Sequence, residues 1–134
     1  MPDHYHLLVK SLSEKIISKY ISDVENSFTR YFNIKNNRKG PLWQSRFKSV
    51  VIKNNQQLLH VSRYVHLNPT TNGLVNRPEE WSFSSYKEII NNPVLLKTGL
   101  KEISMSNRLA YKRFVEKNID HQRWLKQIKK LILE

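Results

Sequence analysis

A strand is predicted by the stretch His4-Tyr5-His6-Leu7-Leu8-Val9, a short run of aromatic, aliphatic and β-branched residues. A second strand is predicted by Arg46-Phe47-Lys48-Ser49-Val50-Val51-Ile52. Apolar residues at helical spacing lie between these segments and after them. The predicted fold class is therefore α+β.

The spacing of apolar residues predicts five helices. Ser13 is expected to cap the first of them, and Ser82 the third. The second is expected to stop at Asn68, because Pro69 disfavours helical dihedral angles in the residue before it. The predicted helices cover residues 13–32, 55–67, a short segment after Ser82, 106–117 and 121–133. In the last helix, apolar residues (Trp124, Ile128, Leu131, Ile132) are predicted to face inward and basic ones (Arg123, Lys126, Lys129, Lys130) outward.

The composition predicts a soluble, cytoplasmic, strongly basic protein. The chain has 134 residues, with 23 Lys and Arg against 11 Asp and Glu, and a net charge of +12. It contains no cysteine, which excludes a disulfide scaffold, a thiolate zinc site and a thiol nucleophile. No apolar run is long enough to cross a bilayer. The charge makes a polyanion the expected partner, nucleic acid before membrane.

Two histidines form the first candidate site. His4 and His6 are two residues apart in a predicted strand, so both imidazoles point to the same face. Two nitrogen ligands on one face can hold a divalent ion and leave coordination positions free for water and substrate oxygens. The alternative is a pair of ordinary surface or packing histidines.

A tyrosine on the second predicted helix forms the other candidate site. His60, Tyr64 and Asn68 are spaced by four and share one helical face, and Arg63 is the basic neighbour of Tyr64. A phenolate can attack a phosphodiester and form a phosphotyrosine, which divides one difficult displacement into two. The alternative is that Tyr64 packs at the edge of the core and Asn68 simply ends the helix.

Four ordered motifs carry a resemblance to a known family. They are residues 1–9 (MPDHYHLLV), 40–47 (GPLWQSRF), 63–69 (RYVHLNP) followed by 73–75 (GLV), and 81–86 (WSFSSY). The chain resembles the single-tyrosine HUH transposases, and in particular the REP-associated tyrosine transposases. The resemblance implies a partial ferredoxin-like HUH domain in residues 1–90. Residues 91–134 are then a helical, basic C-terminal extension.

The resemblance also implies a role for individual residues. His4, His6 and Asn68 would bind Mg²⁺ or Mn²⁺, and Tyr64 would be the nucleophile that becomes linked to a 5′-phosphate. The implied activity is nicking and strand transfer of single-stranded DNA folded into hairpins. His66 lies two residues from Tyr64 and is expected to face away from it, in a structural role.

Further residues are expected to bind the DNA. Arg38, Lys39, Arg46 and Lys48 are predicted to contact phosphates, as is Arg63 beside the tyrosine. Trp43 could stack on unpaired bases, and the alternative is that it anchors the core. The basic face at residues 123–130 could likewise hold DNA or be an ordinary solvated face.

The family's domain has a strand, a helix and another strand before the His-X-His strand, and this chain begins at that strand. We therefore expect an N-terminally truncated domain with an exposed strand edge, which favours a homodimer. One alternative function is an inactive remnant that binds single-stranded DNA without cutting it. Another is an RNA-binding domain.

Overall fold

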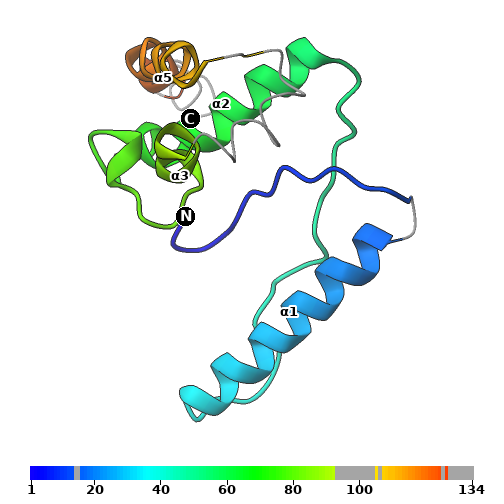
Figure 1. Ribbon diagram of the computed structural model, residues 1–134. Helices are drawn as coiled ribbons and strands as arrows, with labels where there is room; N and C mark the ends of the chain where they lie inside the picture. The colour runs from blue at the N-terminus through cyan, green and yellow to red at the C-terminus, as the bar shows by residue number, and fades with distance from the viewer. Residues whose placement is uncertain (14–15, 93–104, 106, 125, 127–134) are drawn as a thin grey trace. The chain divides into compact units, whose positions relative to one another are not determined.

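The computed structural model describes residues 1–13, 16–92, 105, 107–124 and 126. The chain divides into two compact units, one of residues 1–7 and 52–134 and the other of residues 8–51. The elements, shown in Figure 1, are α1 (Ile16–Lys35), α2 (Asn55–Thr71), the 3-10 helix η1 (Pro78–Glu80), α3 (Tyr86–Asn91) and α5 (Arg108–Glu116). Among the described residues, no helix is long and apolar enough to span a membrane.

The unit of residues 8–51 is built on α1. The described part of this helix begins three residues after Ser13 and ends at Lys35, close to the predicted range. After α1 the chain turns back, and the turn contains Asn37 and Gly40, both with positive φ. The side chain of Asn33 donates to the carbonyl oxygen of Gly40 over 2.9 Å, which joins the turn to the helix end.

Helix α2 is the central element of the other unit. Its N-terminus is capped by Asn54, whose side chain accepts a hydrogen bond from the backbone N–H of Gln57 over 2.8 Å. The predicted start at Asn55 is confirmed, but the predicted stop at Asn68 is wrong, because α2 continues through Pro69 to Thr71. Near the end of a helix, proline removes only the one hydrogen bond that its missing N–H would make, and the following residues still bond backward.

The C-terminus of α2 closes in a Schellman-type turn. The N–H of Gly73 donates to Thr70 O and that of Leu74 donates to Pro69 O, over 3.1 and 3.0 Å. These bonds satisfy two carbonyl groups that the end of a helix leaves without partners. Gly73 has a φ of 71°, a conformation that glycine adopts without a steric penalty.

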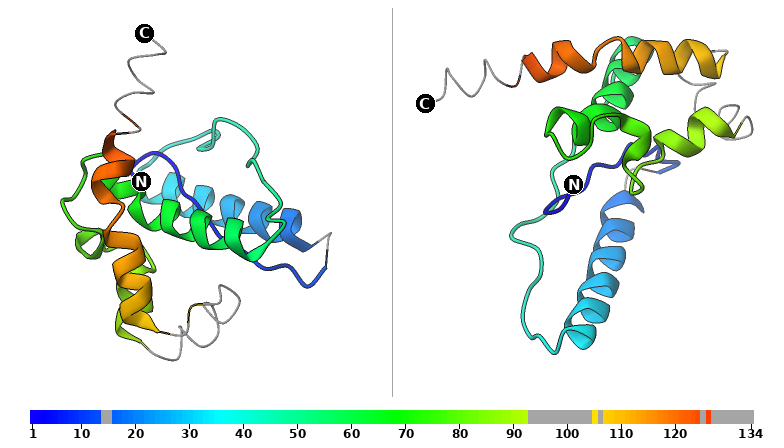
Figure 2. Two further views of the ribbon diagram at one scale, coloured as in Figure 1. Left: turned by 90° about the horizontal axis from the view of Figure 1, so that it is seen from above. Right: turned by 90° about the vertical axis from the view of Figure 1, so that its left-hand side faces the viewer.

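Helices α3 and α5 pack with α2 around one small core. Figures 1 and 2 show α5 lying across α2, with α3 beside both. The fully buried cluster comprises Leu67 of α2, Tyr86 of α3, and Tyr111 and Val115 of α5. The predicted cap at Ser82 is wrong, because α3 begins only at Tyr86 after Ser85. The helix predicted at 106–117 is confirmed by α5.

The α+β prediction is contradicted. In the part of the chain that the structure describes there is no strand, so the two strands of the partial ferredoxin-like domain are not seen. Residues 4–9 and 46–52 are irregular segments in which Leu7, Val50 and Val51 are 57%, 83% and 79% exposed. A β-strand exists only where its backbone N–H and C=O groups pair with a neighbouring strand, and neither segment has such a partner among the described residues.

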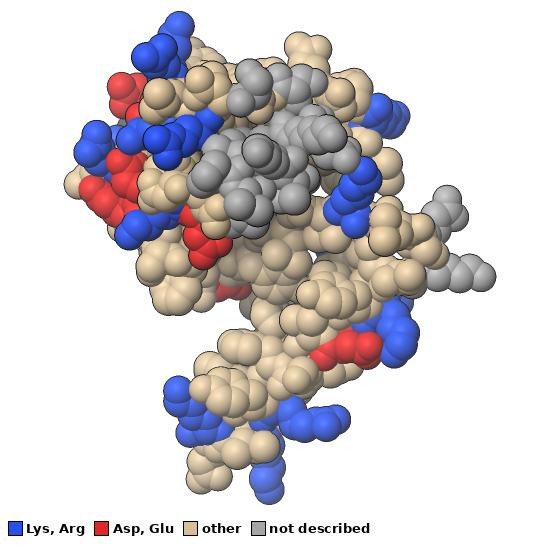
Figure 3. Space-filling view, viewed as in Figure 1, with Lys and Arg blue, Asp and Glu red and all other residues tan. Residues whose placement is uncertain are grey.

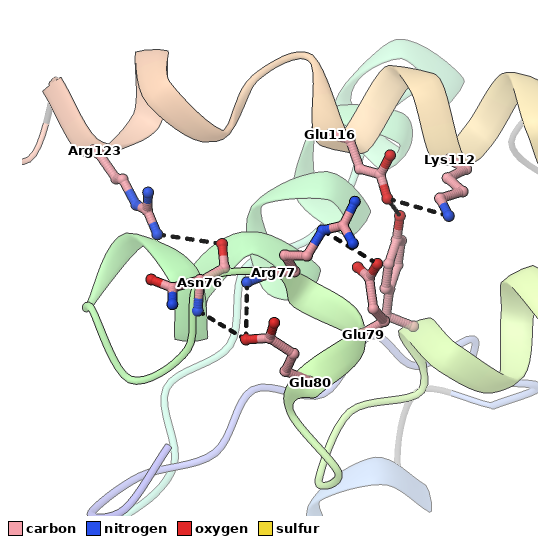
Figure 4. A network of polar contacts seen from close by, with 8 residues as sticks. Asn76, Arg77, Glu79, Glu80, Lys112, Glu116 and Arg123 are labelled. Carbon is pink, nitrogen blue, oxygen red and sulfur yellow. Dashed lines mark hydrogen bonds and ion pairs between the residues drawn. The ribbon is translucent and has the colours of Figure 1, made fainter.

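In the last predicted helix, of which residues 119–124 and 126 are described as helical, the orientation predicted for Trp124 and Arg123 is wrong, whereas Lys126 is exposed as predicted. Trp124 is 55% exposed and stacks beside His121, whereas Arg123 turns toward the protein. Its guanidinium donates to Thr70 O over 3.1 Å and to Asn76 O over 3.3 Å, and Figure 4 shows its reach to Asn76. A cation is favoured at the carbonyl end of a helix, and Thr70 lies in the last turn of α2. Lys129 and Lys130 lie outside the described residues.

Candidate active site

One of the predicted metal ligands, His6, contacts the predicted nucleophile Tyr64, and His4 in turn contacts His6. The His4 and His6 rings lie edge to face with centroids 5.0 Å apart, and the His6 ring is 5.8 Å from that of Tyr64. Tyr64 lies on α2 and is 50% exposed. The N-terminal segment and α2 thus place two imidazoles beside an accessible phenol, although the histidines are not in a strand.

The two histidines differ in their surroundings. Nδ1 of His4 lies 2.7 Å from a carboxylate oxygen of Asp3, which leaves Nε2 of His4 free to bind another group. Partial desolvation, together with the nearby charge of His4, lowers the pKa of His6 below its ordinary value. A lowered pKa favours the neutral form of the His6 ring, which is the form in which imidazole binds a metal.

Asn68 lies one turn beyond Tyr64 on α2, and its side chain is buried, with the residue 5% exposed. Its Oδ1 accepts a hydrogen bond from the side-chain amide of Asn72. An amide oxygen has two lone pairs, so one remains for a further partner. No contact of Asn68 with His4 or His6 is described.

The opposite face of α2 is closed by a buried polar network. Nδ1 of His66 lies 2.7 Å from the hydroxyl of Tyr111, and Nε2 lies 3.1 Å from the hydroxyl of Ser85. The Tyr111 hydroxyl is also 3.0 Å from that of Ser62, one turn before His66. Burial lowers the pKa of His66 to about 4. The structural role predicted for His66 agrees with these contacts.

Arg63 and His60 pack against α5. The Arg63 guanidinium lies over the Phe114 ring, 4.7 Å from its centroid, and the His60 ring is 5.9 Å from the same centroid. Desolvation lowers the pKa of Arg63, and its Nε is buried with no hydrogen-bond partner in the described part of the chain. These contacts tie the helix that carries Tyr64 to α5.

Two of the predicted DNA-binding residues have structural partners in the unit of residues 8–51. Trp43 donates from its indole N–H to Glu25 O over 3.2 Å, and its ring lies 6.1 Å from that of Phe28. These contacts favour the core-anchor interpretation of Trp43. Arg38 donates to Asn33 Oδ1 over 2.9 Å and to Pro41 O over 2.7 Å, so it holds the turn together while staying exposed.

A basic surface surrounds the C-terminal end of α1. Figure 3 shows Lys and Arg side chains gathered there, and the exposed members are Arg30, Lys35, Arg38 and Lys39. Arg46 and Lys48 are also exposed. No Asp or Glu occurs between Glu25 and Glu79, a span with nine Lys and Arg residues. This uneven charge could have been read from the sequence and is the clearest further sign of a polyanion-binding region.

The donor atoms near Tyr64 suit a divalent ion. Centroids 5.0 Å apart allow one nitrogen of each histidine to reach a single ion, because a metal–nitrogen bond is about 2.1 Å long. Within the described ranges, no cluster of three or more His, Cys, Asp or Glu side chains could hold a metal. An amide oxygen is another type of metal ligand, and Asn68 has one on the helix that carries Tyr64.

Two residues near Asn68 were missed by sequence reasoning. Asn72 contacts Asn68, and Lys126 donates to the side-chain oxygen of Asn72. The spacing of four between Asn68 and Asn72 could have suggested the first contact. Nothing in the sequence indicates the second, which joins positions 54 residues apart.

Comparisons with known proteins point to one family. A family model described as "Transposase IS200 like" matches residues 1–68. The chain is 26% identical over 87 residues to the REP-associated tyrosine transposase of Escherichia coli (strain K12), which covers 64% of this chain and 50% of the relative. It is 27% identical over 96 residues to a Haemophilus influenzae (strain ATCC 51907 / DSM 11121 / KW20 / Rd) protein provisionally given the same name, covering 64% and 54%.

The chain spans about half the length of these curated relatives. No solved structure matches it. The family match contains His4, His6 and Tyr64, and it ends at Asn68.

Proposed function

Because the chain belongs to the family of IS200-like transposases, we propose that it nicks and transfers single-stranded DNA through a covalent bond to Tyr64. The observation that carries this proposal is the ring contact between His6 and Tyr64, with His4 beside His6. A half-exposed phenol next to two imidazoles has both the access and the neighbours that phosphodiester cleavage requires.

The step proposed for Tyr64 is an in-line displacement at phosphorus. The phenolic oxygen bonds to the phosphorus as the bond from phosphorus to the 3′-oxygen breaks. The phenolic proton leaves to solvent, and the 3′-oxygen takes a proton from solvent. The products are a 5′-phosphotyrosine and a free 3′-hydroxyl, and attack by a 3′-hydroxyl of another strand reverses the step and completes the transfer.

His4, His6 and Asn68 are the residues proposed to hold the divalent ion. When bound, Mg²⁺ or Mn²⁺ neutralises charge on the scissile phosphate and on the departing oxygen. Two imidazole nitrogens favour Mn²⁺ over Mg²⁺, because Mg²⁺ prefers oxygen ligands. Asp3 is hydrogen-bonded to Nδ1 of His4 and so leaves Nε2 of His4 available for the ion, as carboxylates do for many metal-binding histidines.

The proposed substrate is DNA folded into an imperfect hairpin. The exposed residues Arg30, Lys35, Lys39, Arg46 and Lys48 are suited to the phosphate backbone, and each contact of this kind makes binding weaker as salt rises. Arg38 stays on the same surface, where it also orders the turn.

The test is a covalent-adduct assay. A labelled single-stranded hairpin is incubated with the protein and Mn²⁺, and denaturing electrophoresis separates any protein–DNA adduct. We expect an adduct with the native chain and none with Tyr64→Phe, which removes the nucleophilic oxygen. The matched control is Tyr20→Phe, because Tyr20 is 58% exposed, close to the 50% of Tyr64, and lies in the other unit.

An undiminished adduct in folded Tyr64→Phe would show that another residue is the nucleophile. Salt-dependent binding of the hairpin with no adduct under any metal condition would identify a binding remnant instead. Tighter binding to a structured RNA than to the DNA hairpin would contradict the proposed substrate.

A further inference from the structure

A chain of hydrogen bonds runs from the end of the described chain to Asn68. Lys126 donates to Oδ1 of Asn72, and the Asn72 side-chain amide donates to Oδ1 of Asn68. The same Asn72 amide donates to the backbone oxygen of Asn68 over 2.8 Å. Asn72 and Lys126 both lie beyond residues 1–68, the part that the family model matches.

Donor and acceptor chemistry determines the orientation of both amides. The Lys126 ammonium can only donate, so the Asn72 oxygen faces Lys126 and its NH₂ group faces Asn68. An NH₂ group can only donate, so the atom of Asn68 that faces it is the oxygen. Lys126 therefore selects, through Asn72, which end of the Asn68 amide points toward Asn72.

Several contacts attach the residues that precede Lys126 to the end of α2 and to the turn after it. Arg123 donates to Thr70 O and to Asn76 O, and Figure 4 draws the second of these bonds. Thr71 donates from its hydroxyl to Gln122 Oε1 over 3.2 Å. Gln122, Arg123 and Lys126 are thus each hydrogen-bonded to the C-terminal end of α2 or its cap, and the carbonyl end of a helix favours cations at this place.

We propose that Asn72 and Lys126 are positioning residues that fix the amide of Asn68 for metal binding. This inference rests on the proposed function, in which Asn68 is the third ligand. Hydrogen bonds to ligating groups orient those groups, and their loss weakens metal affinity. Lys126, near the C-terminus, therefore contributes to the metal site although it is no ligand.

The test measures Mn²⁺ affinity in the full chain without DNA, from the electron paramagnetic resonance signal of free Mn²⁺. Loss of a partner of this kind weakens metal binding about 10- to 100-fold. We expect a loss in this range for Asn72→Ala and for Lys126→Met. Lys126→Arg keeps a donor for the Asn72 oxygen and should retain most of the affinity. Lys117→Met, which removes a different exposed lysine, should leave the affinity unchanged.

A double substitution shows whether the effect passes through Asn68. If it does, Lys126→Met added to Asn68→Ala causes no further loss, because the group that Lys126 positions is already gone. Circular dichroism and thermal unfolding show that each variant is folded. Should Asn72→Ala fail to fold, the surface variants of Lys126 give the answer alone.

The failure of this inference is distinct from failure of the proposed ligand set. If Asn68→Ala weakens Mn²⁺ binding while Asn72→Ala and Lys126→Met do not, the positioning roles are wrong and the ligand assignment stands. If Asn68→Ala leaves Mn²⁺ binding unchanged, both are overturned.

Discussion

Two tyrosines on opposite sides of α2 have opposite environments. Tyr64 is 50% exposed and contacts the ring of His6, whereas Tyr111 is fully buried and shares hydrogen bonds with Ser62 and His66. Burial raises the pKa of Tyr111 to about 12, which keeps it a neutral hydroxyl at physiological pH. Tyrosine thus has two roles here. Tyr64 is accessible for chemistry on one face of α2, and Tyr111 makes structural hydrogen bonds on the other face.

The comparison shows how a small unit can present a reactive group. An exposed residue on a helix is held in place only if another face of the helix is anchored. On α2 that anchor is the polar network formed with α5, together with Leu67 in the core. Substitutions on the anchored face of α2 should therefore change the free energy of unfolding strongly. Substitutions on the open face should change reactivity without loss of stability.

The largest effect is expected from pH acting on His66. Its pKa is about 4 in the folded chain against 6.5 for an ordinary histidine, so above pH 6.5 both states are neutral and no stability is lost. As pH falls below 6.5 the unfolded state binds the proton first, and the folded state loses about 2 kcal/mol by pH 5 and about 3 kcal/mol by pH 4. Urea unfolding at a series of pH values measures this loss.

Two variants distinguish the contribution of His66 to this pH dependence from that of other groups that titrate. His66→Gln should flatten the pH dependence between pH 7 and 5, whatever its stability at pH 7. His121→Gln, which changes an exposed histidine, should retain the slope of the native chain. If the free energy of unfolding of His66→Gln changed with pH as steeply as that of the native chain, burial of His66 would not be the cause of the pH dependence.

A smaller effect is expected when each tyrosine loses only its hydroxyl. Tyr111→Phe leaves Ser62 and His66 without their shared partner, and unsatisfied buried polar groups cost about 1–3 kcal/mol. Tyr64→Phe should change the free energy of unfolding by less than about 0.5 kcal/mol, as for most surface substitutions. Chemical denaturation of the two variants compares them directly. Equal losses would erase the distinction between the two faces.

A loss of stability smaller than that of Tyr111→Phe is expected from a substitution at Gly73, in the turn that ends α2. Gly73 has a φ of 71°, and a Cβ there would meet no atom within 4 Å, so only the backbone conformation opposes a side chain. Gly73→Ala should cost about 1 kcal/mol in thermal or urea unfolding. Gly73→Asn, which tolerates this conformation better, should cost less. A larger loss in Gly73→Asn than in Gly73→Ala would contradict a purely backbone effect.

Apolar spacing predicted where the helices lie, because it acts over a few neighbouring positions, but the cap at Ser82 and the stop at Asn68 were wrong. The spacing of Tyr64 and Asn68, and the separate face of His66, were correctly placed on α2. The strands at residues 4–9 and 46–52 were wrong, because a strand depends on a partner that the segment itself does not specify. The prediction that Trp124 faces inward was wrong for a similar reason, because periodicity does not reveal which neighbour a helix face will contact.

The sequence by itself determined the basic charge and the start of α2 at Asn55. It also determined that His4, His6 and Tyr64 lie in motifs that resemble those of a transposase family. Only the tertiary structure brought His6 to Tyr64, placed Tyr111 against His66, and connected Lys126 to Asn68 through Asn72. The physical reason is distance along the chain. Capping and helical spacing depend on residues within a few positions, whereas the His6–Tyr64, Tyr111–His66 and Lys126–Asn72 contacts join residues 45 to 58 positions apart, which meet only when the chain folds.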